Sequence, residues 1–233
     1  MIIESWQPPK VGDLPSPEEQ WLTFDEGRKH RVMVLPALFD EANKMRRFTV
    51  EVMRRLDENG VDTALPDMPG CNESLAALDS QTLQSWRLTA QASALRFAAT
   101  HCLTIRAGDL IGPCDLPGWK YAPTTGSKTL REMLRARVLA GREAAIHETR
   151  DELLEYGRRE GLVLAGWPLG AQMICDLDTA EAVAPGPRTA IDQVQLGGSG
   201  LWLRAEPDES AEQSEALAEL ILADLYPDED SAK

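Results

Sequence analysis

The residue types that usually carry nucleophilic and acid–base chemistry are sparse and widely separated in this sequence. Its three histidines are His30, His101 and His147, and none follows residue 147. A catalytic base must lie within hydrogen-bond reach of the proton that it removes. Isolated histidines without a nearby nucleophile are more often ordinary, partly exposed side chains. We therefore expect none of the three to act as a catalytic base.

The cysteines show no pattern that would bind a metal or form a redox pair. They are Cys71, Cys102, Cys114 and Cys175, with no Cys-x-x-Cys spacing and no histidine nearby in a ligand pattern. We expect reduced, mostly buried thiols. The sequence predicts neither a metal site nor a bound cofactor.

Composition narrows the classes of partner. The chain has 233 residues, 43% of them hydrophobic, and a formal net charge of −14. Nucleic acids and anionic membrane surfaces need a positive footprint, so this charge argues against both. There is no apolar run of the roughly 18 to 20 residues that a membrane span needs, and the N-terminus does not resemble a signal peptide. We predict a cytoplasmic location.

Alternating strand and helix patterns predict an α/β fold. Short apolar runs at 31–35, 61–65 and 102–105 indicate buried strands, and apolar residues recur at helical spacing between them. Strand, helix and strand within about 35 residues form a βαβ unit and hence a parallel sheet. We expect a doubly wound, mostly parallel sheet with helices on both faces. Further along the chain, the patterns predict one long or two broken helices over 127–159, strands at 191–196 and 201–205, and a helix at 210–225.

We divide the chain into an arm, one domain and a tail. Residues 1–27 are rich in proline and acidic residues and predict an ordered or semi-ordered arm, in which prolines block regular structure and Trp6, Trp21 and Phe24 fasten the segment to the domain. Residues 28–226 form the single domain. Residues 227–233 form an acidic, solvated tail.

Several segments resemble known families. Residues 66–74 (PDMPGCNES) resemble the Asp-x-Pro-Gly-x-Gly-x-Ser segment after the fourth strand of α/β-hydrolases. Residues 36–47 (PALFDEANKMRR) and 165–169 (AGWPL) are similar to segments of the exosortase A system-associated hydrolase 2 group, and so are residues 121–126 (YAPTTG). The resemblance spans roughly residues 30–178. It implies an α/β-hydrolase fold, with a helical region after the elbow strand, in a protein of exopolysaccharide and sorting-signal systems.

The resemblance places an arginine where the nucleophile would be. α/β-Hydrolases carry a Gly-x-Ser-x-Gly elbow after the fifth strand, and their triad histidine follows the last strand. The corresponding residues here are 104–108 (TIRAG), so Arg106 takes the serine position and Gly108 keeps the final glycine. A protonated guanidinium has no usable lone pair and cannot attack a carbonyl. With no late histidine, the resemblance implies that the whole triad is missing.

Other candidate site residues follow from their places after predicted strands. Glu206 and Asp208 are weak candidates for the triad acid, and a solvated turn is the alternative. Arg106 has two interpretations: bidentate binding of a carboxylate, phosphate or acidic sugar, or an internal ion pair with Glu41, Asp109 or Glu206. The candidate pocket residues are Pro36, Phe39, Glu41, Asn43, Arg46, Arg106 and Gly108.

Three functional hypotheses remain open. The first is an atypical or non-catalytic α/β-hydrolase-fold protein that binds an anionic small molecule, a glycan precursor or a protein partner. The second is an esterase, thioesterase or acyltransferase whose nucleophile is displaced to Ser74, to Cys114 or to a water activated by Glu41. The third is a structural interaction module or homodimer that uses the N-terminal segment and the helices over 127–159.

Overall fold

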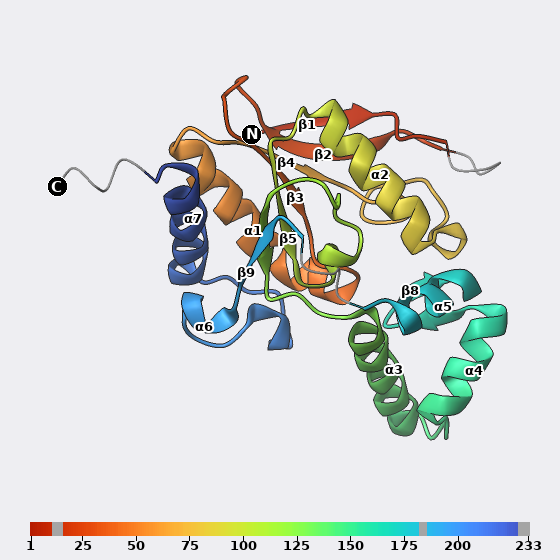
Figure 1. Ribbon diagram of the computed structural model, residues 1–233. Coiled ribbons are helices and arrows are strands. Elements are labelled where there is room, and N and C mark those ends of the chain that lie inside the picture. Colours follow the sequence, from red (N-terminus) through yellow and green to blue (C-terminus); the bar gives the residue numbers. More distant parts are fainter. Residues whose placement is uncertain (11–15, 182–185, 228–233) are drawn as a thin grey trace.

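A computed structural model describes residues 1–10, 16–181 and 186–227. Within these residues seven strands form one sheet, in the order β1-β2-β4-β3-β5-β6-β9 (Figure 1). Only β1, β2 and β4 are antiparallel neighbours, and the pairs from β4 through β9 are parallel. The mostly parallel sheet confirms the predicted fold class. The strands are β1 (Ile2–Trp6), β2 (Glu19–Phe24), β3 (Arg31–Leu35), β4 (Asp62–Pro66), β5 (His101–Ile105), β6 (Gly118–Tyr121) and β9 (Arg188–Ile191).

Helices cover both faces of the sheet (Figure 1). Helices α1 (Asp40–Glu58) and α7 (Ala211–Leu225) pack together on one face, and α2 (Leu83–Arg96) packs on the other. Strand β3 has apolar side chains on both faces: Val32 and Val34 join the core under α1, whereas Met33 and Leu35 join the core under α2. Because successive side chains of a strand point to opposite faces, one apolar strand contributes to two cores.

A helical insertion separates β6 from β9. It consists of α3 (Gly126–Glu143), α4 (Arg150–Glu160), β7 (Leu162–Leu164), β8 (Trp167–Leu169) and α5 (Ala171–Thr179). Figure 1 shows these elements grouped at one end of the sheet. Of the two alternatives for residues 127–159, two helices is correct. Thr149 caps the second helix: its side chain accepts from the Glu152 amide, while the Glu152 side chain accepts from the Thr149 amide.

The N-terminal segment corrects the prediction of an arm without regular structure. Strands β1 and β2 lie inside residues 1–27, and β2 pairs with β4, so the segment is part of the sheet. The side chains of Trp6, Trp21 and Phe24 are buried, which confirms that they fasten the segment. Pro8, Pro9 and Pro17 lie between the two strands, where they interrupt no ladder hydrogen bond. Residues 228–233 of the predicted tail lie outside the described residues.

Two predicted strands near the C-terminus are wrong. Residues 191–196 contain only the end of β9, followed by the short helix α6 (Gln193–Leu196), because the Gln195 side chain accepts from the Asp192 amide and starts a helical turn. Residues 201–205 contain the 3-10 turn η3 (Leu201–Leu203). The Leu201 side chain is buried, but Leu203 is exposed, so the apolar triplet does not form a strand.

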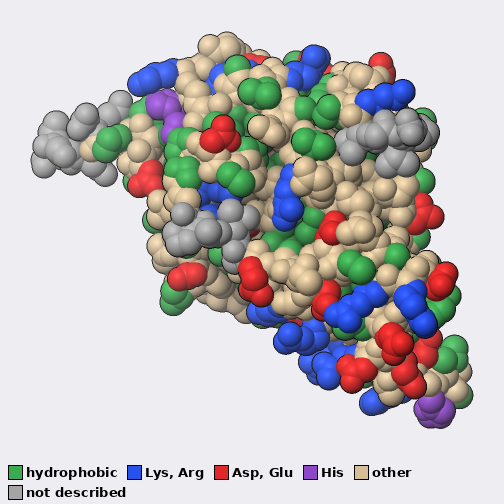
Figure 2. Space-filling view, turned by 45° about the vertical axis from the view of Figure 1, so that its right-hand side comes forward, with side chains coloured by type: hydrophobic (Ala, Val, Ile, Leu, Met, Phe, Trp, Pro, Cys, Tyr) green, Lys and Arg blue, Asp and Glu red, His purple; other side chains and the backbone are tan. Residues whose placement is uncertain are grey.

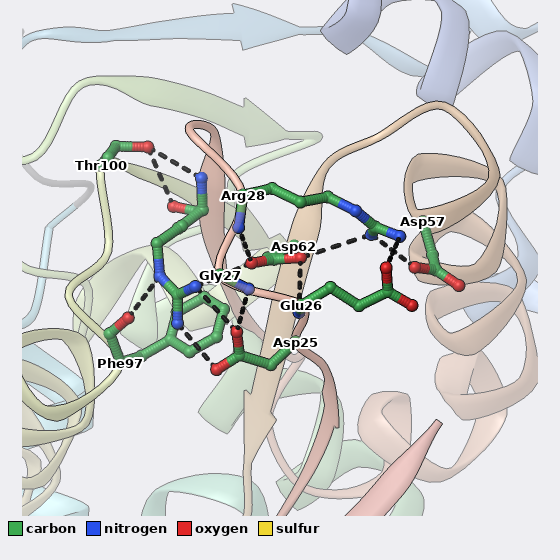
Figure 3. Close-up of polar contacts among 9 residues, drawn as sticks. Asp25, Glu26, Gly27, Arg28, Asp57, Asp62, Phe97 and Thr100 are labelled. Atoms are coloured by element: carbon green, nitrogen blue, oxygen red, sulfur yellow. Dashed lines mark hydrogen bonds and ion pairs between the residues drawn. The ribbon is translucent and has the colours of Figure 1, made fainter.

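A buried carboxylate, Asp62, holds together the segments around the amino end of β4 (Figure 3). Asp62, at the start of β4, is fully buried and accepts from the backbone amides of Glu26 and Arg28 at 3.1 and 2.7 Å. Its other partners are the guanidinium groups of Arg28 and Arg31. This network links the amino end of β4 to β3 and to the turn between β2 and β3. No helix among the described residues is long and apolar enough to cross a membrane.

Candidate functional site

Strand β5 ends in a tight turn with the backbone of an elbow. The 3-10 turn η2 (Arg106–Leu110) follows Ile105 directly, and Arg106 has φ 53°. A left-handed conformation is unfavourable for a residue with a Cβ atom. Gly108 is required by close packing, because a Cβ there would lie 2.3 Å from the Pro36 carbonyl oxygen. The turn is therefore pressed against the loop between β3 and α1.

The Arg106 side chain is buried in an internal ion pair with Glu41. Its Nε donates to Glu41 Oε2 at 3.0 Å and its Nη2 donates to Oε1 at 2.9 Å, which makes a bidentate contact. Its Nη1 donates to the Ala122 carbonyl at 2.9 Å. Arg106 is only 5% exposed. Of the two interpretations of Arg106, the geometry matches the internal pair, and of its three candidate partners it selects Glu41.

Trp202 completes the enclosure of Arg106. The guanidinium carbon lies 4.1 Å from the centroid of the Trp202 ring, at cation–π distance. Trp202 lies on η3, about a hundred residues along the chain, in the segment that the sequence analysis assigned to a strand. Nothing in its local sequence pointed to this role. Arg106 is held by a carboxylate, a carbonyl and an aromatic face.

A second buried ion cluster holds the other side of the turn. Asp109 is fully buried and lies 3.2 Å from Lys120 Nζ and 3.3 Å from Arg188 Nη2. The hydroxyl of Thr104 also donates to Asp109, at 3.2 Å. Lys120 and Arg188 come from β6 and β9, so sequence spacing could not have paired them with Asp109. The cluster links η2 to three neighbouring strands.

Four of the seven candidate pocket residues, Pro36, Phe39, Glu41 and Arg46, line two small cavities, and Asn43, Arg106 and Gly108 line neither. Phe39, Glu41, Lys44, Met133 and Trp202 are among the residues around a cavity of about 180 Å³, called here the mouth cavity. Pro36, Phe39 and Arg46 lie beside another of about 30 Å³, the volume of roughly one water molecule. Asn43 is exposed, and Arg46 lies 3.5 Å from Asp67. The structure thus pairs Arg106 with Glu41, places Glu41 beside Phe39 in the wall of the mouth cavity, and leaves Asn43 at the surface.

Solved structures show the same arrangement of sheet and helices. Est1E from Butyrivibrio proteoclasticus superposes with a TM-score of 0.55 at 12% identity, over 95% of this chain and 98% of that chain. Alpha/beta hydrolase domain-containing protein 10 from mouse superposes with a TM-score of 0.53 at 12% identity, over 82% and 77% of the two chains. The chain has the α/β-hydrolase fold.

The comparisons establish nothing narrower than this fold. The alignment with a putative hydrolase from Agrobacterium vitis, at 18% identity and a TM-score of 0.45, spans only 60% of that protein's length. No protein-family model matches the chain, and no curated protein sequence matches it significantly. At identities this low, structural similarity shows the fold and not the activity.

In α/β-hydrolases the nucleophile works with a histidine, and none of the three histidines here is among the partners of Arg106. His30 and His101 lie at the amino ends of β3 and β5, with ring centroids 6.0 Å apart. Strand β5 separates His101 from Arg106 by roughly 16 Å at ~3.3 Å per residue. Burial lowers the pKa of both histidines. His147 lies in the turn between α3 and α4.

The weak triad-acid candidates lie at the surface. Glu206 and Asp208 are exposed in the segment after η3, and neither contacts Arg106. Asp208 pairs with Arg204. The backbone amide of Glu209 and the Arg204 guanidinium lower the pKa of Asp208. The structure therefore matches a solvated turn at these positions.

The candidates for a displaced nucleophile differ in their surroundings. The Ser74 hydroxyl donates to Glu19 Oε1 at 2.7 Å and accepts from the amides of Gly70 and Ala76. Glu19 is 1% exposed, and burial raises its pKa from 4.5 to about 7. Cys114 is an exposed free thiol. Among the described residues, no group of three or more His, Cys, Asp or Glu side chains is placed to hold a metal ion.

Proposed function

We propose that this α/β-hydrolase-fold protein does not hydrolyse esters or thioesters and acts by binding. The bidentate Arg106–Glu41 pair at the nucleophile position is the observation that carries the proposal. Arginine supplies no lone pair for attack. Both oxygens of Glu41 accept from Arg106, so this carboxylate already serves as the partner of the arginine. A fold that lacks its nucleophile and its histidine has lost the chemistry of the triad.

The proposed ligand is an anionic small molecule or a glycan precursor that enters the mouth cavity. Glu41 and Trp202 line this cavity, and both contact Arg106. A carboxylate or phosphate that displaced Glu41 would recover a bidentate contact with the guanidinium. The resemblance of residues 36–47 and 165–169 to the exosortase-associated group adds the proposed setting, a cytoplasmic step of an exopolysaccharide or protein-sorting system.

Isothermal titration calorimetry with glucuronate, an acidic sugar, tests whether an anion replaces Glu41 as the partner of Arg106. We expect Glu41→Gln to bind it about ten-fold more tightly than the unchanged protein, because the amide no longer neutralises Arg106; one lost charged hydrogen bond corresponds to about 1.4 kcal/mol or more. Arg106→Ala should abolish the binding. Equal affinities in all three proteins, or no binding by Glu41→Gln, would reject an anionic ligand at Arg106.

Hydrolysis assays test the absence of catalysis. We expect p-nitrophenyl acetate and an acyl-coenzyme A thioester to be cleaved no faster with the protein, or with Arg106→Ala, than in buffer alone. Release at ordinary esterase rates, of about 1 s⁻¹ or more, that Arg106→Ala leaves unchanged would show that a nucleophile elsewhere is at work.

Ser74 gives the second candidate function, a serine hydrolase or acyltransferase with a displaced nucleophile. The specific observation in its favour is the 2.7 Å hydrogen bond to Glu19, a carboxyl group with a pKa of about 7, which is suited to general-base catalysis near neutral pH. A fluorophosphonate probe followed by intact-mass measurement decides the point. A single adduct that Ser74→Ala removes would favour this candidate, and an unmodified mass would reject it.

A further inference from the structure

The helical insertion carries a groove that is separate from the mouth cavity. It encloses about 880 Å³ between α4, the β7–β8 hairpin, the start of α5 and the short 3-10 turn η1 (Leu78–Ser80). None of its lining residues also lines the mouth cavity. We call it the insertion groove. Its volume lies within the range of sites that bind ligands or peptide side chains.

The charge of the insertion groove is mainly negative. Asp79, Glu148, Glu152 and Glu160 line it, together with one cation, Arg137. Arg137 is already paired with Glu148 through two contacts of 3.0 and 3.1 Å. Within the described residues Asp79 and Glu160 have no ion-pair partner. The groove therefore presents uncompensated negative charge, although Figure 2 shows acidic and basic side chains intermingled over this end of the molecule.

Apolar surface lies between these carboxylates. The side chains of Leu153 and Leu169 are buried in the lining, at 5% and 1% exposure, whereas Tyr156 and Val163 are about half exposed. A half-exposed tyrosine ring among carboxylates attracts a Lys or Arg side chain through its π face. The groove is thus complementary to a chain that carries both cationic and apolar side chains.

The spacing along α4 fits an extended chain. Glu152, Tyr156 and Glu160 follow at intervals of four residues on one face of the helix. At ~1.5 Å per residue this row is about 12 Å long, the length of roughly four residues of extended chain. Glu152 is fixed at the start of the row, because its carboxylate accepts from the amide and hydroxyl of Thr149.

We propose that the insertion groove is a docking site for a short, extended, basic segment of a partner protein. The charge complementarity and the carboxylate–tyrosine–carboxylate row carry this proposal. It is independent of the proposed function, because it involves neither Arg106 nor Glu41. Lys or Arg side chains of the segment contact Glu160, Asp79 and the Tyr156 ring, and its apolar side chains lie against Val163 and the leucines.

Fluorescence anisotropy with a labelled Lys-Leu-Lys-Leu-Lys peptide tests the docking site. We expect Asp79→Asn with Glu160→Gln to weaken binding about five- to ten-fold, as two exposed charge contacts of up to ~1 kcal/mol each would. Tyr156→Ala should weaken it about three-fold. Glu155→Gln, on α4 but outside the groove lining, is the matched control and should change the affinity less than about two-fold.

Four other results would overturn the proposed docking site. Equal weakening by Glu155→Gln and by the groove variants would show general attraction to a chain of net charge −14. The same follows if a Glu-Leu-Glu-Leu-Glu peptide binds as well as the basic one. If spermine displaces the peptide and binds more tightly with the same variant profile, the groove is a polyamine site and not a peptide site. Absence of peptide binding at millimolar concentration also rejects the docking site.

Discussion

At the scale of single residues, Arg106 combines a left-handed backbone with a buried charge. A left-handed residue with a Cβ costs about 1–2 kcal/mol, and a buried charge without a partner costs several kcal/mol more. Glu41, the Ala122 carbonyl and the Trp202 ring offset these costs. The elbow conformation persists here because the turn is also packed around Gly108 and tied down through Asp109.

Arg106→Ala should therefore destabilise the fold. We expect a loss of about 3 kcal/mol in the free energy of unfolding, because Glu41 would stay partly buried without its partner. Urea denaturation followed by circular dichroism measures this loss. Arg54→Ala is the control: Arg54 is half exposed and, among the described residues, pairs only with Glu51 on the same helix, so a loss below about 0.5 kcal/mol is expected. Similar losses in both variants would contradict the structural importance of the Arg106–Glu41 pair.

Glu19 should make stability depend on pH in the direction opposite to most carboxylates. Its pKa is raised from 4.5 to about 7 in the folded chain, so the folded state binds more protons than the unfolded state between these values. The contribution of Glu19 to the free energy of unfolding is therefore fully present below pH 4.5 and is lost as the pH rises toward 7. At 1.36 kcal/mol per pKa unit, the loss is up to about 3 kcal/mol.

Glu19→Gln tests this dependence, because an amide does not titrate and still accepts from Ser74. Denaturation curves between pH 4.5 and 8 should show a smaller decrease in stability with rising pH for the variant than for the unchanged protein. Parallel curves for the two proteins would show that Glu19 titrates near its ordinary pKa.

The sequence identified Arg106 as the unusual residue but could not choose its partner. Glu41, Asp109 and Glu206 were all plausible, because the chain is rich in acidic residues. The strand register determines which cations pair with Asp109. Lys120 lies opposite Thr104 and Arg188 lies opposite Gly118, and both pair with Asp109 in place of Arg106. Such pairing depends on tertiary packing, which no local pattern records. Trp202 was missed for the same reason.

At the scale of elements, strands made of a continuous apolar run were predictable, whereas a strand with an interrupted run and a turn that resembles a strand were not. Strand β3 has the predicted bounds, 31–35, and four of its five residues are buried. Residues 201–203 are as apolar as a strand, but they have no neighbouring strand beside them and form a 3-10 turn. The short strand β6 was not assigned, because Gly118 and Lys120 interrupt its apolar pattern. Apolar runs predict elements only where both faces are covered.

Gly108→Ala should disrupt the elbow turn. The added Cβ would lie 2.3 Å from the Pro36 carbonyl oxygen, a backbone atom that cannot rotate away. We expect a loss of about 3 kcal/mol or more in the free energy of unfolding. Gly141→Ala is the matched control on α3, where the nearest atom is 3.4 Å away. That variant should be neutral or stabilised by up to about 1 kcal/mol. Equal effects on thermal denaturation would contradict the close packing of the elbow.

At the scale of the whole molecule, the N-terminal segment belongs to the domain. The sequence suggested an arm because this segment is rich in proline and acidic residues, although its buried tryptophans were correctly identified as anchors. Trp6 and Trp21 stack at 5.8 Å, and Phe97 packs edge-on against Trp21. These contacts join strands β1 and β2 to the core under α2. Prolines exclude regular structure only at their own positions.

Deletion of residues 1–26 should therefore unfold the protein. It would remove two strands of the sheet, leave the edge of β4 unpaired, and expose side chains now covered by Trp6 and Trp21. We expect loss of the cooperative thermal transition in circular dichroism, with aggregation. A deletion variant that stays monomeric and melts within a few degrees of the full chain would restore the idea of a detachable arm.

The central claim is that the chain has lost the chemistry of the triad, and not the serine alone. Arg106→Ser tests it most directly, because this substitution restores a hydroxyl at the elbow without a histidine to activate it. Release of p-nitrophenol from the acetate ester should be the same for Arg106→Ser and Arg106→Ala, at the rate of the unchanged protein. Turnover by Arg106→Ser at about 1 s⁻¹ or more would contradict the account, since it would show that a base and an oxyanion site are still in place.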